Sequence, residues 1–115
     1  MSVTLYGIKN CDTVKKARKW LDANSVPYTF HDFRVDGINK TLVNNFLKQI
    51  DKEILINKRG TTWRKLSDEE KEIKTKTQAV ELMVENPTII KRPVLDVNKK
   101  IILGFSEEIY KSLKL

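Results

Sequence analysis

Cysteine and histidine are scarce in this sequence. The chain of 115 residues has one of each, Cys11 and His31. A lone cysteine cannot close an intrachain disulfide, whereas small secreted domains usually carry paired cysteines. With so few metal ligands and no glycine-rich phosphate loop, we expect neither a metal site nor a bound cofactor. Cys11 is therefore either a reactive thiol or a small packing residue.

Long hydrophobic runs are missing as well. No apolar stretch approaches the ~20 residues of a membrane span, and the first residues lack the basic and apolar regions of a secretory signal. We therefore expect a cytoplasmic protein that has no membrane partner. The sequence contains no internal repeat or low-complexity linker. Because domains cluster near ~100 to 150 residues, we expect a single domain over residues 1–115 and a monomer.

Acidic residues are outnumbered, and the formal net charge is +7. The lysines are scattered along the chain, without the arginine-rich stripe or aromatic–basic cluster that nucleic-acid-binding modules carry. We interpret most of this charge as solvated surface and expect no nucleic-acid partner. An anionic substrate, an acidic protein partner and nucleic acid are the alternatives that the charge leaves open.

The first third of the chain alternates strand, helix and strand. Residues 3–6 favour a strand that ends at Gly7, and apolar residues at helical spacing then predict a helix to about Ala23. Residues 28–33 alternate like a second strand, entered through Pro27, which the interior of a helix hardly accepts. A βαβ unit of this kind predicts two parallel strands.

The middle of the chain is more polar and favours helices. Apolar residues at helical spacing predict helices over about residues 42–50 and 79–84. Residues 57–64 are interpreted as a loop. The pattern of Ser67–Glu70 predicts a capping box at the start of a further short helix. This part of the chain, about residues 38–86, is therefore predicted to be a helical insertion.

The last third returns to strands. Residues 88–90, 94–97 and 101–103 predict strands, of which the last two form a hairpin. Ser106 predicts the cap of a final helix. The inner face of that helix is expected to contain Ile109, Tyr110 and Leu113.

The order of these elements resembles that of a thioredoxin-like fold. We therefore predict an α/β protein with a mixed central sheet and an inserted helical subdomain. The thioredoxin-like core is expected at about residues 1–35 and 87–115, on either side of the insertion.

Cys11 falls in the loop between the first strand and the first helix. Unpaired backbone N–H groups and the helix dipole stabilise an anion at a helix start, and a cysteine thiolate is such an anion. Lys9, Lys15 and Lys16 add positive charge, whereas Asp12 opposes them or caps the helix. Because open α/β sheets bind ligands at the carboxyl ends of their strands, we favour a reactive thiol over a packing residue.

A Cys-x-x-Cys pair is absent, since Val14 stands where the second cysteine would be. A mixed disulfide on Cys11 then has no second thiol in the chain to resolve it, and an outside thiol must do so. Glutathione, or a partner redoxin such as glutaredoxin, is therefore the expected co-substrate.

Three segments together resemble the arsenate reductase (ArsC)/Spx family, in its YffB-like branch. They are Gly-Ile-Lys-Asn-Cys-Asp-Thr at residues 7–13, Arg-Gly-Thr-Thr-Trp-Arg at residues 59–64, and Lys-Arg-Pro at residues 91–93. The resemblance runs essentially end to end. In the glutathione-dependent arsenate reductases of this family, the cysteine thiolate attacks arsenate, glutathione attacks the adduct, and three arginines hold the oxyanion.

This resemblance implies a role for particular residues. Cys11 takes the position of the nucleophile, and Arg59 and Arg92 take two of the arginine positions, where a planar guanidinium suits an oxyanion and stabilises a thiolate. Pro93 matches the proline that thioredoxin-like folds keep in cis, so the backbone of Arg92 would pair with a bound peptide such as glutathione. The further candidates for binding substrate or glutathione are Lys9, Asn10, Lys15, Arg64 and Pro93.

Two departures from the family pattern bear on the substrate. Gly104 stands where the third arginine should lie, and Lys15 stands where the family's Cys-Gly-Thr-Ser-Arg loop has its arginine. We therefore predict a glutathione-dependent thiol–disulfide oxidoreductase with an oxyanion or disulfide substrate. One alternative is a true arsenate reductase that uses glutathione and glutaredoxin. The other is an Spx-like regulator that binds RNA polymerase without chemistry, although Spx-type sensors often switch through a Cys-x-x-Cys disulfide.

Overall fold

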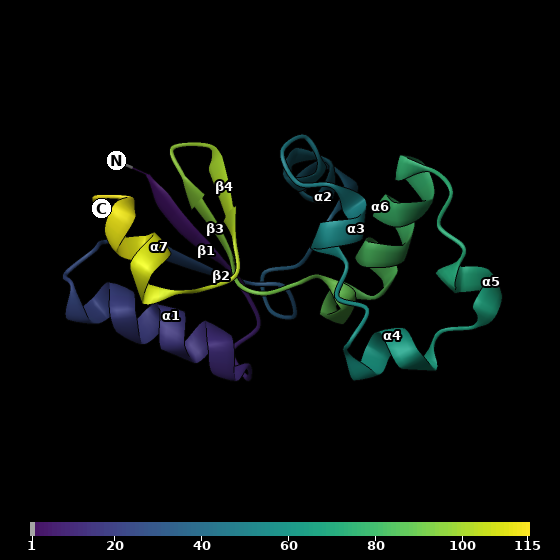
Figure 1. The fold of residues 1–115 in the computed structure, drawn as a ribbon, viewed down its shortest axis with the longest axis horizontal. Helices are drawn as coiled ribbons and strands as arrows, with labels where there is room; N and C mark the ends of the chain where they lie inside the picture. Colours follow the sequence, from purple (N-terminus) through teal and green to yellow (C-terminus); the bar gives the residue numbers. More distant parts are fainter. Residues whose placement is uncertain (1) are drawn as a thin grey trace. The chain divides into compact units, whose positions relative to one another are not determined.

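A computed structural model describes residues 2–115, and its contacts divide the chain into two compact units. The first unit combines the segment up to Asp36 with Arg92–Leu115, and the second comprises Gly37–Lys91. Figure 1 shows a sheet in the first unit and short helices in the second. Within the described residues, no helix is long and apolar enough to cross a membrane. The single domain over residues 1–115, with the bounds given to its core and insertion, stays a prediction.

The first unit is built on a four-stranded sheet with the strand order β2-β1-β3-β4. Its strands are β1 (Val3–Gly7), β2 (Thr29–Asp32), β3 (Val94–Val97) and β4 (Lys100–Leu103). β1 pairs in parallel with β2 and antiparallel with β3, and β3 pairs antiparallel with β4. The predicted mixed sheet is therefore confirmed. A helical crossover joins the parallel pair, whereas a tight hairpin joins β3 to β4.

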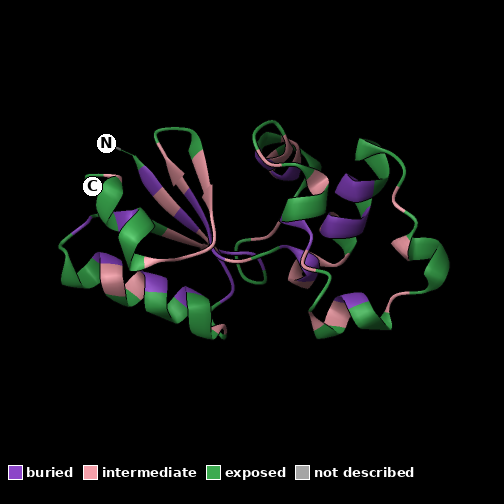
Figure 2. Ribbon diagram, viewed as in Figure 1, coloured by how far each residue is buried: buried purple, intermediate pink, exposed green. Residues whose placement is uncertain are grey.

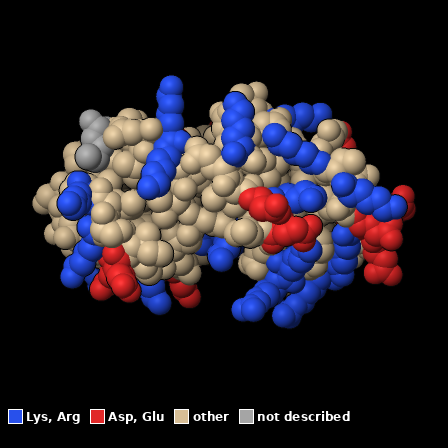
Figure 3. All heavy atoms as spheres, turned by 45° about the horizontal axis from the view of Figure 1, so that its top comes forward, with Lys and Arg blue, Asp and Glu red and all other residues tan. Residues whose placement is uncertain are grey.

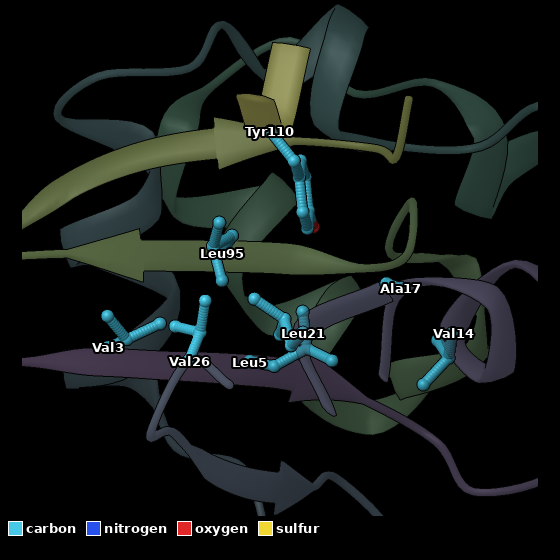
Figure 4. Packing of buried hydrophobic residues seen from close by; sticks show 8 residues of the cluster. All are labelled: Val3, Leu5, Val14, Ala17, Leu21, Val26, Leu95 and Tyr110. Carbon is cyan, nitrogen blue, oxygen red and sulfur yellow. The ribbon is translucent and has the colours of Figure 1, made fainter. Parts of the chain in front are cut away.

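Helix α1 (Asp12–Ala23) packs against one face of this sheet. Its buried residues Val14, Ala17 and Leu21 are three or four positions apart, so they lie on one side of the helix. Figure 2 shows buried residues along β1 and β3 and on one side of α1. The cluster that these elements form, drawn in Figure 4, consists of Val3, Leu5, Val14, Ala17, Leu21, Val26, Leu95 and Tyr110.

Helix α7 (Glu107–Ser112) contributes Tyr110 to the same core. The hydroxyl of Ser106 accepts a hydrogen bond from the backbone N–H of Ile109 at 3.1 Å, so the predicted cap is confirmed. The prediction that Ile109 belongs to the inner face is wrong, because its side chain is 47% exposed. Successive residues of a helix are turned by about 100°, so Ile109 points away from the core when Tyr110 points into it.

Removing the hydroxyl of Tyr110 is expected to flatten the decline of stability at alkaline pH. Burial raises the pKa of Tyr110 well above its ordinary value. The unfolded chain releases this proton near pH ~10, whereas the folded chain keeps it. The stabilising contribution is therefore complete below about pH 10 and is lost as the pH rises further. Tyr110→Phe removes this contribution, which reaches about 1.4 kcal/mol of unfolding free energy per pH unit.

Urea unfolding of wild type and Tyr110→Phe between about pH 8 and pH 11 measures this difference. The hydrogen bond from the Tyr110 hydroxyl to the Gly104 carbonyl is long, 3.5 Å, so the two proteins should have similar stability at neutral pH. A decline that runs in parallel in the two proteins would contradict the prediction.

The second unit consists of short helices. They are α2 (Lys40–Leu47), α3 (Lys52–Leu55), α4 (Thr61–Lys65), α5 (Asp68–Lys71), α6 (Lys76–Glu85) and the 3₁₀ helix η1 (Pro87–Ile89). α6 packs against α2 and η1, and α4 also packs against η1. The predicted capping box is present at the start of α5, where the Ser67 hydroxyl accepts from the Glu70 N–H at 3.1 Å.

Two predictions about the second unit are wrong. The loop predicted over residues 57–64 is interrupted by α4, which begins at Thr61. A helix of barely more than one turn is too short to show a hydrophobic period. The strand predicted over residues 88–90 is instead η1, followed by an isolated bridge between Ile90 and Ile56. A short run of β-branched residues does not distinguish a strand from a buried turn.

Candidate active site

Cys11 is the N-cap residue of α1. Its backbone is extended, with φ −131° and ψ 125°, and its carbonyl accepts a hydrogen bond from the Lys15 N–H at 2.9 Å. Asp12 is already the first helical residue, so the interpretation of Asp12 as the cap is wrong. The Cys11 side chain is half-buried against the core cluster of the first unit. Cys11 therefore lies at the positive end of a helix that the core holds in place.

The pairing of the strands brings other segments to the end of the sheet where β1 leads into the Cys11 loop. At the end of β1, Gly7 pairs with Asp32, the last residue of β2. Tyr6 pairs with Val94, the first residue of β3. The turn after β2, the segment before β3 and the Cys11 loop therefore all join the sheet at the same end of its strands.

The segment that precedes β3 contains two of the predicted site residues, Arg92 and Pro93. The peptide bond between them is cis, which is the geometry that the family resemblance implies. Arg92 is half-buried and Pro93 is buried. The carbonyl of Pro93 accepts a hydrogen bond from the Gly104 N–H at 2.8 Å. Gly104 has a φ of +80°, where side chains are disfavoured, so the backbone favours glycine at the position that the resemblance gives to a third arginine.

Three other predicted residues line one cavity of about 430 Å³ in the first unit. They are Lys9 and Asn10, from the loop that ends at Cys11, and Lys15, from the first turn of α1. The other side of the cavity is formed by the end of β2 and the turn after it. The residues there are Asp32, Arg34 and Val35.

Asp32 connects the two sides of this cavity. It is the one charged residue that is buried among residues 2–115, at 6% exposure. Its Oδ2 accepts a hydrogen bond from the Lys9 N–H at 3.1 Å, and its Oδ1 accepts one from the Arg34 N–H at 2.8 Å. Two further hydrogen bonds join Asp32 to Asp36. The Asp32 N–H donates to Asp36 Oδ2 at 2.8 Å, and the Asp36 N–H donates to the Asp32 carbonyl at 2.7 Å. One carboxylate thus holds the Cys11 loop against the turn after β2.

The sequence interpretation missed Asp32 and Arg34 as residues of this site. The signal that leads to them is topological, because parallel neighbouring strands end at the same edge of a sheet. Asp32 is near the end of the predicted second strand. The predicted βαβ unit would therefore have placed it close to the Cys11 loop.

Arg59 and Arg64 belong to the second unit. Arg59 is exposed in the turn before α4, and its N–H donates to Asn57 Oδ1 at 3.1 Å. It lines a cavity of about 450 Å³ together with Lys58 and Glu53, among others. The Lys58 ammonium donates to Glu53 at 2.6 Å, and this hydrogen bond lowers the pKa of the Glu53 carboxyl.

Arg64 lies in the last turn of α4 and is also exposed. The structure therefore brings Lys9, Asn10 and Lys15 together around a cavity, and it brings the Arg92–Pro93 segment to the same sheet edge. The roles of all the predicted site residues stay predictions.

Basic side chains are scattered over the face of the protein that Figure 3 draws. Figure 3 shows Lys and Arg side chains across the visible face, with acidic side chains between them. Among the residues that the structure describes, no group of three or more His, Cys, Asp or Glu side chains is placed to hold a metal ion. That nucleic acid, metal and bound cofactors have no part in the function remains an expectation.

The sequence profile of the ArsC family matches residues 6–113. The chain belongs to the ArsC family. Its fold is the thioredoxin-like fold of thiol oxidoreductases that are related to arsenate reductases. In this chain the fold comprises the mixed sheet and helix α1, which follows β1 and has the cysteine as its N-cap residue.

Three relatives illustrate the range of proteins that this ArsC-family chain resembles. The structure of a YFFB protein superposes with a TM-score of 0.92, is 40% identical, and the match covers 96% of this chain and 97% of that one. An arsenate reductase (ArsC) related protein from Brucella melitensis is 45% identical, with a TM-score of 0.78 and coverage of 100% and 97%. The global transcriptional regulator Spx 2 of Lactococcus lactis is 28% identical over 92% of this chain and 81% of its own length. The resemblance to the ArsC/Spx family is therefore confirmed.

Proposed function

We propose that this ArsC-family protein is a glutathione-dependent thiol–disulfide oxidoreductase whose nucleophile is Cys11. The observation that carries the proposal is the position of Cys11 as the N-cap residue of α1. The Arg92–cis-Pro93 segment joins the sheet at the same end of the strands as the Cys11 loop. Unpaired N–H groups of the first helical turn favour a thiolate at this position. A thiolate is the form of cysteine that attacks a disulfide.

The reaction proceeds in two exchanges. The Cys11 thiolate attacks one sulfur of a disulfide, a bond forms between the two sulfurs, and the other sulfur leaves as a thiolate that takes a proton from water. The thiolate of glutathione then attacks the substrate sulfur of this mixed disulfide. A new disulfide between glutathione and the substrate leaves, and the electron pair of the broken bond returns to Cys11. Glutathione or glutaredoxin must supply the second thiol, because the chain has no other cysteine.

Arg59 and Arg92 are proposed to bind the anionic substrate and to stabilise the thiolate of Cys11. Replacing either by alanine should then slow alkylation of Cys11 by iodoacetamide at neutral pH by about two- to fivefold, the range of one partly solvated ion pair. Lys100→Ala is the control for the loss of one positive charge. Lys100 pairs with Val97 at the end of β3 that is remote from Arg92. Alkylation rates of the three variants and wild type measure the effect.

Arg92→Lys separates the two roles. Lysine keeps the positive charge but lacks the planar fork, so the alkylation rate should be retained while the Michaelis constant for an anionic substrate rises. If alkylation is unchanged in both alanine variants, these arginines do not activate Cys11.

Arsenate reduction is the second candidate, supported by membership of the ArsC family. The left-handed backbone at Gly104, in the place of a third arginine, counts against it. Turnover of arsenate in the presence of glutathione and glutaredoxin, compared with turnover of a glutathione mixed disulfide, distinguishes the two reactions. Arsenate turnover at a comparable rate would favour the arsenate reductase.

A regulator that binds RNA polymerase is the candidate from another class, supported by the similarity to Spx 2. The experiment is co-purification of the tagged protein with polymerase, using wild type and Cys11→Ser. Retention of polymerase by both proteins, combined with no thiol exchange by wild type, would replace the enzymatic proposal.

A further inference from the structure

We infer that the cavity between the Cys11 loop and the turn after β2 binds a carboxylate of the disulfide substrate, with Arg34 as a specificity-determining residue. This inference rests on the proposed function, because it concerns the substrate on which Cys11 acts. It adds a cation from an element that neither the sequence motifs nor the three family arginines include. We call this cavity, lined by Lys9, Asn10, Lys15, Asp32, Arg34 and Val35, the β2-turn cavity.

The β2-turn cavity lies beside the nucleophile. Asn10, which lines it, is covalently joined to Cys11, and Lys15, which also lines it, donates its N–H to the Cys11 carbonyl at 2.9 Å. A molecule in the cavity would therefore contact residues on both sides of Cys11 in the chain, Asn10 before it and Lys15 in the first turn of α1. A short disulfide whose substituent occupied the cavity would therefore be held close in the chain to the residue that attacks it.

The charges around the β2-turn cavity favour an anion. Lys9, Lys15 and Arg34 are all exposed cations, and Asp32 is the one acid that lines the cavity. Both Asp32 oxygens already accept backbone N–H groups, so part of its charge is compensated within the protein. The planar fork of a guanidinium matches the two oxygens of a carboxylate, which makes Arg34 the residue best suited to recognise one.

The buried carboxylate also keeps this arrangement in place before any ligand binds. Asp32 binds the N–H of Lys9 from one side and the N–H of Arg34 from the other, so the backbones of two cation-bearing segments are fixed by one side chain. A site whose backbone is already fixed loses less conformational freedom when it binds its ligand.

The remaining wall of the β2-turn cavity suits the aliphatic part of a small thiol. Val35 is 81% exposed and presents an apolar surface among the charged residues that line the cavity. The volume of about 430 Å³ falls in the range of small-molecule sites, about 300 to 1,000 Å³. The ligand class is therefore a small thiol or disulfide that carries at least one carboxylate on a short carbon chain.

Two disulfides that differ in charge test this inference. Dithiodipropionate carries a carboxylate on each half, and hydroxyethyl disulfide is a neutral molecule of similar size. The rate constant for exchange with Cys11 is measured for both, and the ratio of the anionic to the neutral rate constant is the readout. Arg34→Gln should lower this ratio by about three- to fivefold, the effect expected for one solvent-exposed ion pair, because the rate constant for the anionic disulfide falls more than that for the neutral one.

Lys100→Gln is the matched control, because it also removes one positive charge from the first unit but lies outside the cavity. A ratio that stays constant in Arg34→Gln, or that falls equally in Lys100→Gln, would overturn the inference, because the preference would then come from the net charge of the protein. A wild-type protein that exchanges with neither disulfide would contradict the proposed function instead.

Binding without chemistry separates the two failures. Cys11→Ser cannot exchange, but it should still bind dithiodipropionate, with changes in the amide NMR signals of Lys9 and Arg34, and Arg34→Gln in the same background should weaken this binding by about three- to fivefold. Unchanged amide signals on addition of dithiodipropionate would overturn the cavity as a carboxylate site whatever the outcome of the exchange assay.

Discussion

Cys11→Ser is expected to lower thiol–disulfide exchange by at least about 1,000-fold, to the rate without protein. The physical reason is that a serine hydroxyl stays protonated at neutral pH and is a far weaker nucleophile than a thiolate. The chain contains no second cysteine that could replace it. Consumption of glutathione in the presence of hydroxyethyl disulfide, coupled to reduction of the oxidised glutathione, measures the loss.

The stability of Cys11→Ser serves as the control for this experiment. Cys11 is half-buried at the rim of the core cluster, and serine is also a good N-cap residue, so the free energy of unfolding should change by less than about 1 kcal/mol. Loss of exchange in a protein of unchanged stability identifies the sulfur as the cause. Exchange that survives the substitution would exclude Cys11 as the nucleophile.

Gly7→Ala is expected to destabilise the protein by about 1 to 3 kcal/mol, the usual cost of overpacking a core. A Cβ atom at Gly7 would lie 2.7 Å from Cγ2 of Val14, closer than real Cβ contacts come, and 3.3 Å from its Cγ1, which is also tight. Val14 is fully buried and β-branched, so its side chain has little freedom to move away. Urea unfolding measures the change in free energy.

The same substitution should also reach the nucleophile. Val14 lies in the first turn of α1, and Cys11 caps that turn, so a displacement of the helix start moves the thiol. The rate of exchange by Cys11 should fall by about tenfold or more, since small misplacements of reacting groups cost that much. This combination of lower stability and slower exchange distinguishes Gly7 from a residue that only contributes to packing.

Two further variants test the physical cause. Gly60→Ala is a comparison variant without a clash, because its nearest neighbour would be 3.4 Å away, an ordinary contact, and its expected cost is that of alanine at the N-cap of α4. In a Val14→Ala background the two Cγ atoms are absent, so Gly7→Ala should cost at least about 1 kcal/mol less than it does in wild type. An equal cost in both backgrounds would show that the contact with Val14 is not the cause.

The local elements of the first unit were predictable because their signals lie in adjacent residues. The spacing of Val14, Ala17 and Leu21 indicates α1 and its buried side, and the structure buries all three. Ser106 likewise indicates the start of α7, because a helix cap needs residues only three positions apart. The signal fails where an element is as short as α4, or where the burial of one residue such as Ile109 depends on how a whole helix packs.

The candidate site shows the same division. The position of Cys11 at the start of a helix follows from local sequence, and so does the absence of a second thiol to resolve its disulfide. The Arg92–Pro93 segment was reached through the family resemblance, and the pairing of β3 with β1 brings it to the edge of the Cys11 loop.

The amino-acid sequence alone specifies a thiol at the start of a helix, an α/β order of elements and an excess of positive charge. Each of these depends only on residue types and their spacing. Tertiary structure decides which charges lie beside the Cys11 loop. Asp32 and Arg34 are more than twenty positions away from Lys9 along the chain, and they meet it only because β1 and β2 pair in parallel and end together. A buried carboxylate that accepts the N–H group of a residue on the neighbouring strand's loop, as Asp32 does from Lys9, leaves no periodic signal in the sequence, since the distance that it spans is set by the sheet.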